Sequence, residues 1–182
     1  PGFAANTADD AVVLTANGVN GNIEHTAGVS WIGRAAPLTY AGNGSFRVLS
    51  GTTQFDGPVT VSMPTVVAAG ATLDAAGSLG LTQGVALAGT LSGSGGVTLS
   101  GNSSWTGGTM AGTGATQLSA GASLSASSAG TLVSTRSFSN AGTLDLVGGT
   151  VQMAALAGND GVIRLGGGAT LDRSEEHTSE LQ

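Results

Sequence analysis

Short runs of apolar and β-branched residues recur along this chain, separated by Gly, Pro and Asn. Early examples are Ala11–Thr15, Val29–Ile32, Leu38–Tyr40 and Ser45–Leu49, and the same rhythm continues beyond them. Runs of three to five such residues, each closed by turn-forming residues, are typical of short β-strands. The pattern therefore predicts an all-β protein built from many short strands.

A Thr followed by an apolar residue returns at nearly constant intervals and gives the clearest period. Successive Thr residues are 18, 19, 22, 19 and 20 positions apart, in the pairs Thr72-Leu73, Thr90-Leu91, Thr109-Met110, Thr131-Leu132, Thr150-Val151 and Thr170-Leu171. The series extends backwards to Thr52 and then to Ile32. A fixed period of this size indicates a solenoid, in which each coil buries its apolar side chains against its neighbours.

Two further series interleave with the first. One follows Tyr40, Thr60, Gly80, Thr98, Gln117, Ser137 and Leu156, and the other follows Val66, Val85, Ser104, Ser123, Thr143 and Val162. Three short strands in each coil of about 20 residues, with neighbouring coils paired in parallel, predict a right-handed parallel β-helix. A β-sandwich is the alternative, because short strands with regular turn signals are also typical of that fold.

Alternation within the strands assigns side chains to the inside or the outside of the coil. In Thr143–Leu146 and Val162–Leu165 the apolar positions point inward, so Asp145 and Arg164 point outward on adjacent coils and should form an ion pair. The same parity places the apolar member of each Thr pair in the core and the Thr column in water. Trp105 aligns with Leu124, Leu144 and Ile163, which predicts that it is buried.

Composition narrows the range of functions. The 182 residues include 32 Gly but no Cys, only 9% are charged, and the formal net charge is −6. The chain has no Lys, so a basic surface that follows phosphates, and with it nucleic-acid binding, is not expected. Without Cys, neither disulfides nor thiolate metal sites can form. No apolar run approaches the ~18 residues of a membrane helix, so this segment is not expected to insert into a membrane.

Several repeats resemble those of large bacterial surface proteins. AGTL occurs at 88–91, 129–132 and 141–144, GATLD occurs at 70–74 and 168–172, and a related Gly/Thr-rich run spans Trp105–Leu118. In style they are similar to the β-helical adhesins of the filamentous-haemagglutinin-like and autotransporter-passenger group. This resemblance, which covers about Val59 to Asp172, implies export through the outer membrane and display at, or release from, the bacterial cell surface. It transfers no catalytic residue.

The last ten residues break the repeat pattern. Residues 173–182 contain three Glu and no Gly, and they match the translation of a sequencing adapter (AGA TCG GAA GAG CAC ACG TCT GAA CTC CAG). We therefore expect residues 1–172 to form one β-helical array, a fragment of a longer protein, followed by a non-native tail at 173–182. The alternative for the tail is a short charged surface helix.

Acidic residues and the lone internal His are the candidates for chemistry. Cleavage of glycosidic bonds requires paired carboxylates, but the carboxylates are scattered over the series, at Asp9, Asp10, Glu24, Asp56, Asp74, Asp145, Asp160 and Asp172. Asp9-Asp10 is the only adjacent pair, and a turn before the first strand explains it. Glu24-His25 has no second His nearby in the sequence, so a surface loop is favoured over a metal or acid–base site.

The remaining motifs also have plain structural explanations. The run Gly95–Gly101 lacks the Asp of calcium-binding glycine repeats, and Gly166–Gly168 has no following helix or Lys, which favours a turn over a phosphate loop. Exposed aromatic residues could stack on sugars, and the candidates are Trp31, Trp105 and Phe138. The Thr column could present hydroxyls to ice or polysaccharide, but it lacks the Thr-x-Thr spacing, and strand propensity explains it.

The sequence thus favours a non-enzymatic structural or adhesive segment of a secreted or cell-surface bacterial protein. No catalytic, cofactor-binding or metal-binding residue is assigned, and no cofactor is expected. The expected partners are host-cell or matrix glycans and proteins. A polysaccharide-active β-helix enzyme, of the lyase or glycosidase type, and a passive spacer stalk are the alternatives.

Overall fold

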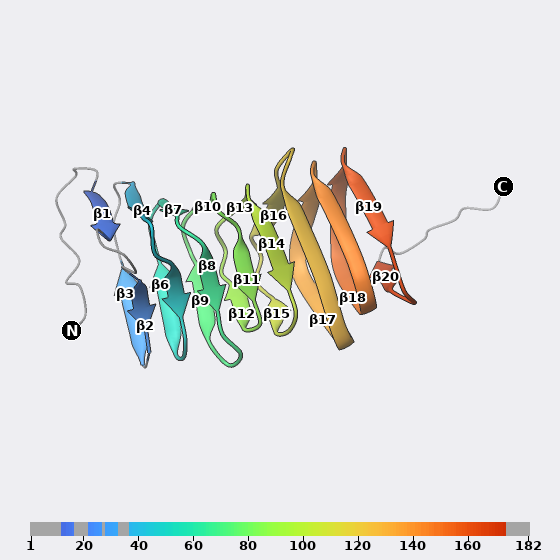
Figure 1. Cartoon of the computed structure of the whole chain (residues 1–182), viewed down its shortest axis with the longest axis horizontal. Coiled ribbons are helices and arrows are strands. Elements are labelled where there is room, and N and C mark those ends of the chain that lie inside the picture. Colours follow the sequence, from blue (N-terminus) through green and yellow to red (C-terminus); the bar gives the residue numbers. More distant parts are fainter. Residues whose placement is uncertain (1–11, 17–21, 27, 33–36, 174–182) are drawn as a thin grey trace.

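The chain is an all-β solenoid of parallel strands. The computed structural model describes residues 12–16, 22–26, 28–32 and 37–173. These residues form twenty strands and no helix, and every strand pairing among them is parallel. The strands wind through about seven turns of about 20 residues, and in Figure 1 they follow one another along the long axis from blue to red. The predicted β-helix of stacked short strands is therefore confirmed.

Three stacks of strands form the three faces of the coil, and two long strands run through all of them. The first face contains β1 (Val12–Ala16), β4 (Leu38–Gly42), β7 (Val59–Ser62), β10 (Leu79–Leu81), β13 (Val97–Leu99) and β16 (Ala115–Leu118). The second contains β2 (Ile23–His25), β5 (Phe46–Val48), β8 (Thr65–Val67), β11 (Val85–Leu87), β14 (Asn102–Trp105) and β19 (Val162–Leu165). The third contains β3 (Val29–Ile32), β6 (Thr52–Phe55), β9 (Thr72–Ala75), β12 (Thr90–Ser92), β15 (Thr109–Met110) and β20 (Thr170–Arg173). The long strands are β17 (Ser123–Asn140) and β18 (Thr143–Asn159).

Apolar side chains fill the coil because strand residues alternate between its inside and its outside. Leu73 pairs with Leu91, and Leu91 pairs with Met110, so identical positions of successive coils stack in the core. Their exposure is 1% or less. Leu132 and Val151 are buried as predicted, whereas Leu171 is only partly buried, on the last strand of the described solenoid. The Thr members of these pairs lie outside, half-buried or exposed.

Two registers near the N-terminal end differ from the predicted series by an odd number of residues. Thr60 pairs with Thr39, not Tyr40, and Thr52 pairs with Val29, not Ile32. An odd slip moves a residue to the other face of its strand. Tyr40 is accordingly buried, at 2% exposure, whereas Thr60 faces outward. The bulky ring enters the core, where it packs against two Phe rings with centroids 5.2 and 6.0 Å away.

The third predicted series contains similar errors. Val66 pairs with Ala86, one residue after the predicted Val85. Ser104 pairs with Ser125, two residues after the predicted Ser123. Trp105 consequently pairs with Ala126, not with Leu124. The coil lengths explain this, because successive residues of this stack are 20, 18, 21, 20 and 19 positions apart from Val66 to Arg164. A constant period cannot follow such variation.

Two further slips, each by an even number of residues, occur where β15 and β16 pair with β17. Gln117 pairs with Ser139, not Ser137, and Thr109 pairs with Val133, not Thr131. A slip by an even number of residues keeps each side chain on the same side of its strand, so the predicted inward and outward positions are correct in these strands. The Thr column is nevertheless interrupted between β15 and β17, and it resumes as Thr131, Thr150 and Thr170.

Arg173 is the last described residue and pairs with Met153 at the end of β20. Residues 174–182 lie outside the described part of the chain. The non-native origin of the tail stays a prediction, as does the single array over residues 1–172.

Candidate functional site

The structure separates the two members of the Glu24-His25 candidate. Glu24 forms an ion pair with Arg47 on the next coil, with 2.9 Å between Oε1 and Nη1. His25, its neighbour on β2, alternates to the other side of the strand, where Nε2 lies 3.3 Å from the carbonyl oxygen of Gly28. The two side chains do not converge on one reacting atom or metal. Asp9 and Asp10 lie outside the described residues.

Each of four carboxylates has its own partner, at a different place on the solenoid. Asp56 accepts a hydrogen bond from Gln54 Nε2 at 2.8 Å, and Asp74 accepts one from Ser92 Oγ at 2.6 Å. On later coils the pairs are Asp145 with Arg164 and Asp172 with Gln152. Asp160 is exposed in the turn after β18. Within the described ranges, no three His, Asp or Glu residues are close enough together to hold a metal ion.

The predicted ion pair between Asp145 and Arg164 is confirmed. The two residues are register partners on β18 and β19, and Arg164 Nη1 lies 3.5 Å from Asp145 Oδ1. The Arg164 side chain is exposed, at 65%, and that of Asp145 is half-buried, at 34%. An ion pair in this setting contributes at most about 1 kcal/mol, so it reports the register and does little to hold the coils together.

The aromatic candidates for sugar stacking are largely removed from solvent. Trp105 and Phe138 are both fully buried in the coil. Their rings fill the core, as predicted for Trp105. Trp31 lies on β3, but its side chain falls outside the described part of the structure. Gly166–Gly168 form the predicted turn between β19 and β20, closed by a hydrogen bond from the Ala169 N–H to the Gly166 carbonyl.

The outward side chains of the second face form a row that contains both charged and small uncharged residues. We define the second-face rank as the outward residue of each stacked strand, in order Glu24, Arg47, Val66, Ala86, Ser104, Ser125, Asp145 and Arg164. Each residue of the rank pairs with the next one on the neighbouring coil, and from Arg47 to Asp145 each is flanked by buried residues. The rank carries one ion pair at each end and four uncharged residues between them.

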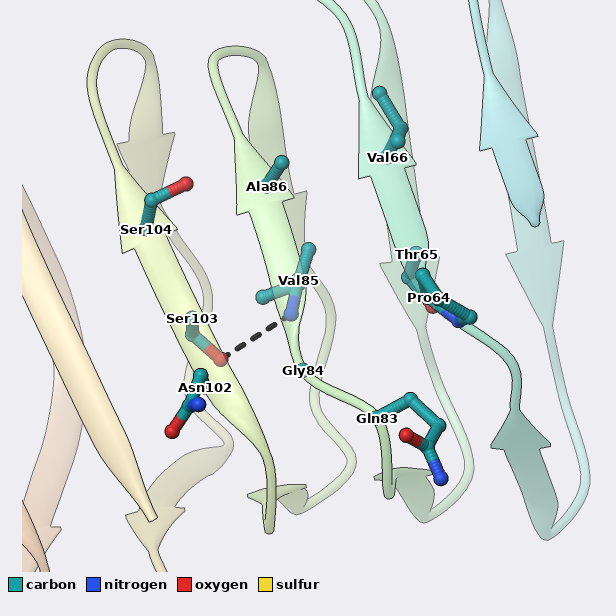
Figure 2. A pocket seen from close by; sticks show the side chains of 10 residues that line it. All are labelled: Pro64, Thr65, Val66, Gln83, Gly84, Val85, Ala86, Asn102, Ser103 and Ser104. Carbon is teal, nitrogen blue, oxygen red and sulfur yellow. Dashed lines mark hydrogen bonds between the residues drawn. The ribbon is translucent and has the colours of Figure 1, made fainter.

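Two shallow grooves lie along this rank. The first, of about 340 Å³, includes Val66, Ala86 and Ser104 in its lining. Figure 2 shows these three side chains on adjacent strands, and it shows the hydrogen bond of 3.1 Å from the Val85 N–H to Ser103 Oγ. The second groove, of about 440 Å³, includes Ser125, Asp145 and Arg164. The small residues in the middle of the rank thus line an uncharged groove, and the charged pair near the C-terminal end lines a separate one.

A buried arginine was missed by the sequence reasoning. Arg136 is fully buried, and burial lowers its pKa, an effect that the nearby charge of Asp74 opposes. All five of its N–H groups have acceptors, which are Thr116 Oγ1 and the carbonyl oxygens of Gly93, Gly95, Ala111 and Ala115. Strand parity could have revealed it, because Arg136 follows the buried Ser134 and precedes the buried Phe138 at intervals of two.

Arg136 belongs to the scaffold, since its donors contact only turns of the chain and the start of β16. Gly93 and Gly95 lie in the turn before β13, and Ala111 lies in the turn before β16. The guanidinium group therefore joins three successive coils at one corner. With all its donors engaged inside the coil, it has none left for a ligand.

No protein family, no curated protein and no solved structure matches this chain. The described residues contain no helix that is long and apolar enough to cross a membrane.

Proposed function

We propose that this chain is a non-enzymatic, rod-forming segment of a large secreted or cell-surface bacterial protein, such as an adhesin or an autotransporter passenger. The single observation that carries the proposal is the continuous register of outward ranks along the stacked coils. Such ranks offer an extended surface, whereas catalysis needs groups that converge on one point. The repeat style described above supports the surface location.

The proposed mechanism is mechanical and interfacial. About seven turns at a rise of roughly 4.8 Å each produce a rod on the order of 34 Å long. The outward rank of the first face is uncharged and consists of hydroxyl, amide and Gly positions, namely Thr39, Thr60, Gly80, Thr98, Gln117, Ser139 and Gly158. Repeated weak contacts from such ranks to host-cell or matrix glycans or proteins would add up through multivalency.

Binding assays on arrays of glycans and extracellular-matrix proteins test the adhesive role. An adhesive segment binds at least one ligand class, and deletion of residues 66–124 reduces that binding. This deletion removes three coils and brings Ser125 to the register position of Val66. A passive spacer gives a rod in electron micrographs but no binding to any array. A compact particle in electron micrographs or in small-angle scattering would contradict both roles.

A polysaccharide-active enzyme is the second candidate, favoured by one specific observation. Asp145 and its basic partner Arg164 both line the groove of about 440 Å³. Most glycosidases, however, need two carboxylates about 5–10 Å apart, and Asp145 has no second carboxylate among the residues that line this groove. An enzyme would release oligosaccharides from a glycan panel, and Asp145→Asn would abolish the release. If the wild-type chain releases none, this candidate is wrong.

A further inference from the structure

The charges of the second-face rank follow an order that is complementary to its own reverse. From the N-terminal end the rank is negative at Glu24 and positive at Arg47, and near the C-terminal end it is negative at Asp145 and positive at Arg164. Between them lie Val66, Ala86, Ser104 and Ser125, which carry no charge. The rank read backwards therefore has the opposite sign at every charged position.

We propose that this face binds a second copy of the same chain in antiparallel orientation. A two-fold axis between Ala86 and Ser104 places Glu24 opposite the partner copy's Arg164 and Arg47 opposite its Asp145. Such an interface is isologous, because each contact occurs twice. This proposal goes beyond the proposed function and does not rest on it.

The charges also select the orientation. In a parallel arrangement Glu24 would face its own counterpart in the other copy, and the same holds for Arg47, Asp145 and Arg164. Like charges in contact are unfavourable, and complementary charges determine orientation more than affinity. In the antiparallel arrangement each exposed ion pair joins the oppositely ordered pair of the partner copy, which gives two clusters of four alternating charges.

The middle of the rank is shaped for close approach. Val66, Ala86 and Ser104 line the groove of about 340 Å³, and their short side chains allow two sheets to approach to roughly the 10 Å of packed β-sheets. The first-face rank lacks charges, so it has no comparable signal for orientation.

The size of the face predicts a weak dimer. Eight stacked strands, about 4.8 Å apart and three residues wide, cover on the order of 350 Å² per copy. Stable complexes bury about 800 Å² per partner, so association is expected at high micromolar concentration or above. Dense display of many copies would raise the effective concentration.

Charge-swap variants test this proposal without removing the intrachain ion pairs. The C-terminal swap is Asp145→Arg with Arg164→Glu, and the N-terminal swap is Glu24→Arg with Arg47→Glu. Each swap preserves the net charge and one ion pair within the chain, but it places like charges opposite each other in the antiparallel dimer. Sedimentation equilibrium at low salt and up to about 1 mM protein measures the association, and urea denaturation checks that each variant is folded.

The expected pattern is specific to the antiparallel arrangement. The wild-type chain associates, each swap variant alone associates at least tenfold more weakly, and an equimolar mixture of the two variants associates as the wild type does. A chain with both swaps also regains association. As an uncharged control, Ala86→Trp fills the uncharged groove and weakens association in every background. A wild-type chain that stays monomeric at 1 mM, or swap variants that associate as well as the wild type, would overturn the proposal.

Discussion

Replacement of Arg136 by Met should be among the most damaging single changes in the coil. The substitution keeps an unbranched side chain of similar length but removes five N–H donors from a fully buried position. Four of their acceptors are backbone carbonyls of neighbouring coils, three in turns and one at the start of β16, at distances of 2.5 to 3.1 Å from the guanidinium nitrogens. These carbonyls remain in place when the side chain changes.

Two opposing effects determine the size of the loss. Removal of a buried charge relieves a desolvation penalty of several kcal/mol, and a complete buried ion pair can for this reason be replaced by apolar residues without loss. Here only one side of the interaction is removed, and each buried acceptor left without its donor costs about 1–3 kcal/mol. Of the three turn carbonyls, that of Gly93 has a second donor, the Gly114 N–H at 3.3 Å. We therefore expect a net loss of about 3–5 kcal/mol in the free energy of unfolding.

Urea denaturation followed by circular dichroism and by Trp fluorescence measures this loss, and coincident transitions establish that one free energy describes unfolding. Arg136→Lys retains the charge but has three donors on one atom, so it should recover less than half of the loss. Arg47→Met is the matched control, because it removes an exposed Arg with a single carboxylate partner and should cost less than about 1 kcal/mol. The reasoning is refuted if Arg136→Met is within about 0.5 kcal/mol of the wild type, or if Arg136→Lys restores full stability.

Three further predictions concern single positions in the coils. Burial raises the pKa of Tyr40 to about 12, so the folded state keeps this proton to a higher pH than the unfolded state does. About 3 kcal/mol of stability should therefore be lost as the pH rises from 10 to 12. Because this is the chain's only Tyr, tyrosinate absorbance follows its ionisation directly, and ionisation near pH 10 in the folded chain would contradict the prediction. Trp105→Phe should lower the free energy of unfolding by only about 1 kcal/mol, since the buried indole N–H has no hydrogen-bond partner in the described structure. Trp105→Ala should lower it by about 3–5 kcal/mol, and equal urea midpoints for the two variants would refute this. Gly84→Ala should be much more damaging than Gly70→Ala, although the two residues have similar φ angles of +81° and +79°. A Cβ added at Gly84 would lie 1.9 Å from the Asn102 carbonyl oxygen, whereas one added at Gly70 meets nothing within 4 Å. We expect a loss of about 1–2 kcal/mol for Gly70→Ala and a clearly larger one for Gly84→Ala in thermal or urea unfolding, and equal losses would contradict the close packing of the coils.

The length of the coil and the alternation of inward and outward side chains could be predicted from the sequence, because both follow from local rules. Thr72 and Thr90 recur at the coil length, and Leu73 and Leu91 must point inward when the Thr side chains point outward. The ion pair between Asp145 and Arg164 was predictable for the same reason, since their coil is 19 residues long and regular.

The exact register could not be predicted, because the coil length varies where the turns vary. A coil of 18 residues joins Ala86 to Ser104, and the next one of 21 residues joins Ser104 to Ser125. No local signal in the sequence indicates which turn carries the additional residues. The order of charges along the second-face rank became visible only once these registers were known.

The hydrogen-bond acceptors of Arg136 could not be predicted from the sequence, for a different physical reason. They are mainly carbonyl groups of Gly and Ala in turns, which carry no side-chain signature, and they come from residues 21 to 43 positions away. Strand parity alone could place the arginine inside the coil. Its partners required the stacked turns of three coils.

Distances between spin labels along the second-face rank test the stacked solenoid most directly. The chain has no Cys, so pairs of introduced cysteines can be labelled without background. The pairs Val66 with Ser125, Val66 with Arg164, and Glu24 with Arg164 are three, five and seven coils apart in the register. We predict backbone separations of roughly 14, 24 and 34 Å, in proportion to the number of coils. Separations that level off at the diameter of a globule, or that do not increase in this order, would contradict the solenoid.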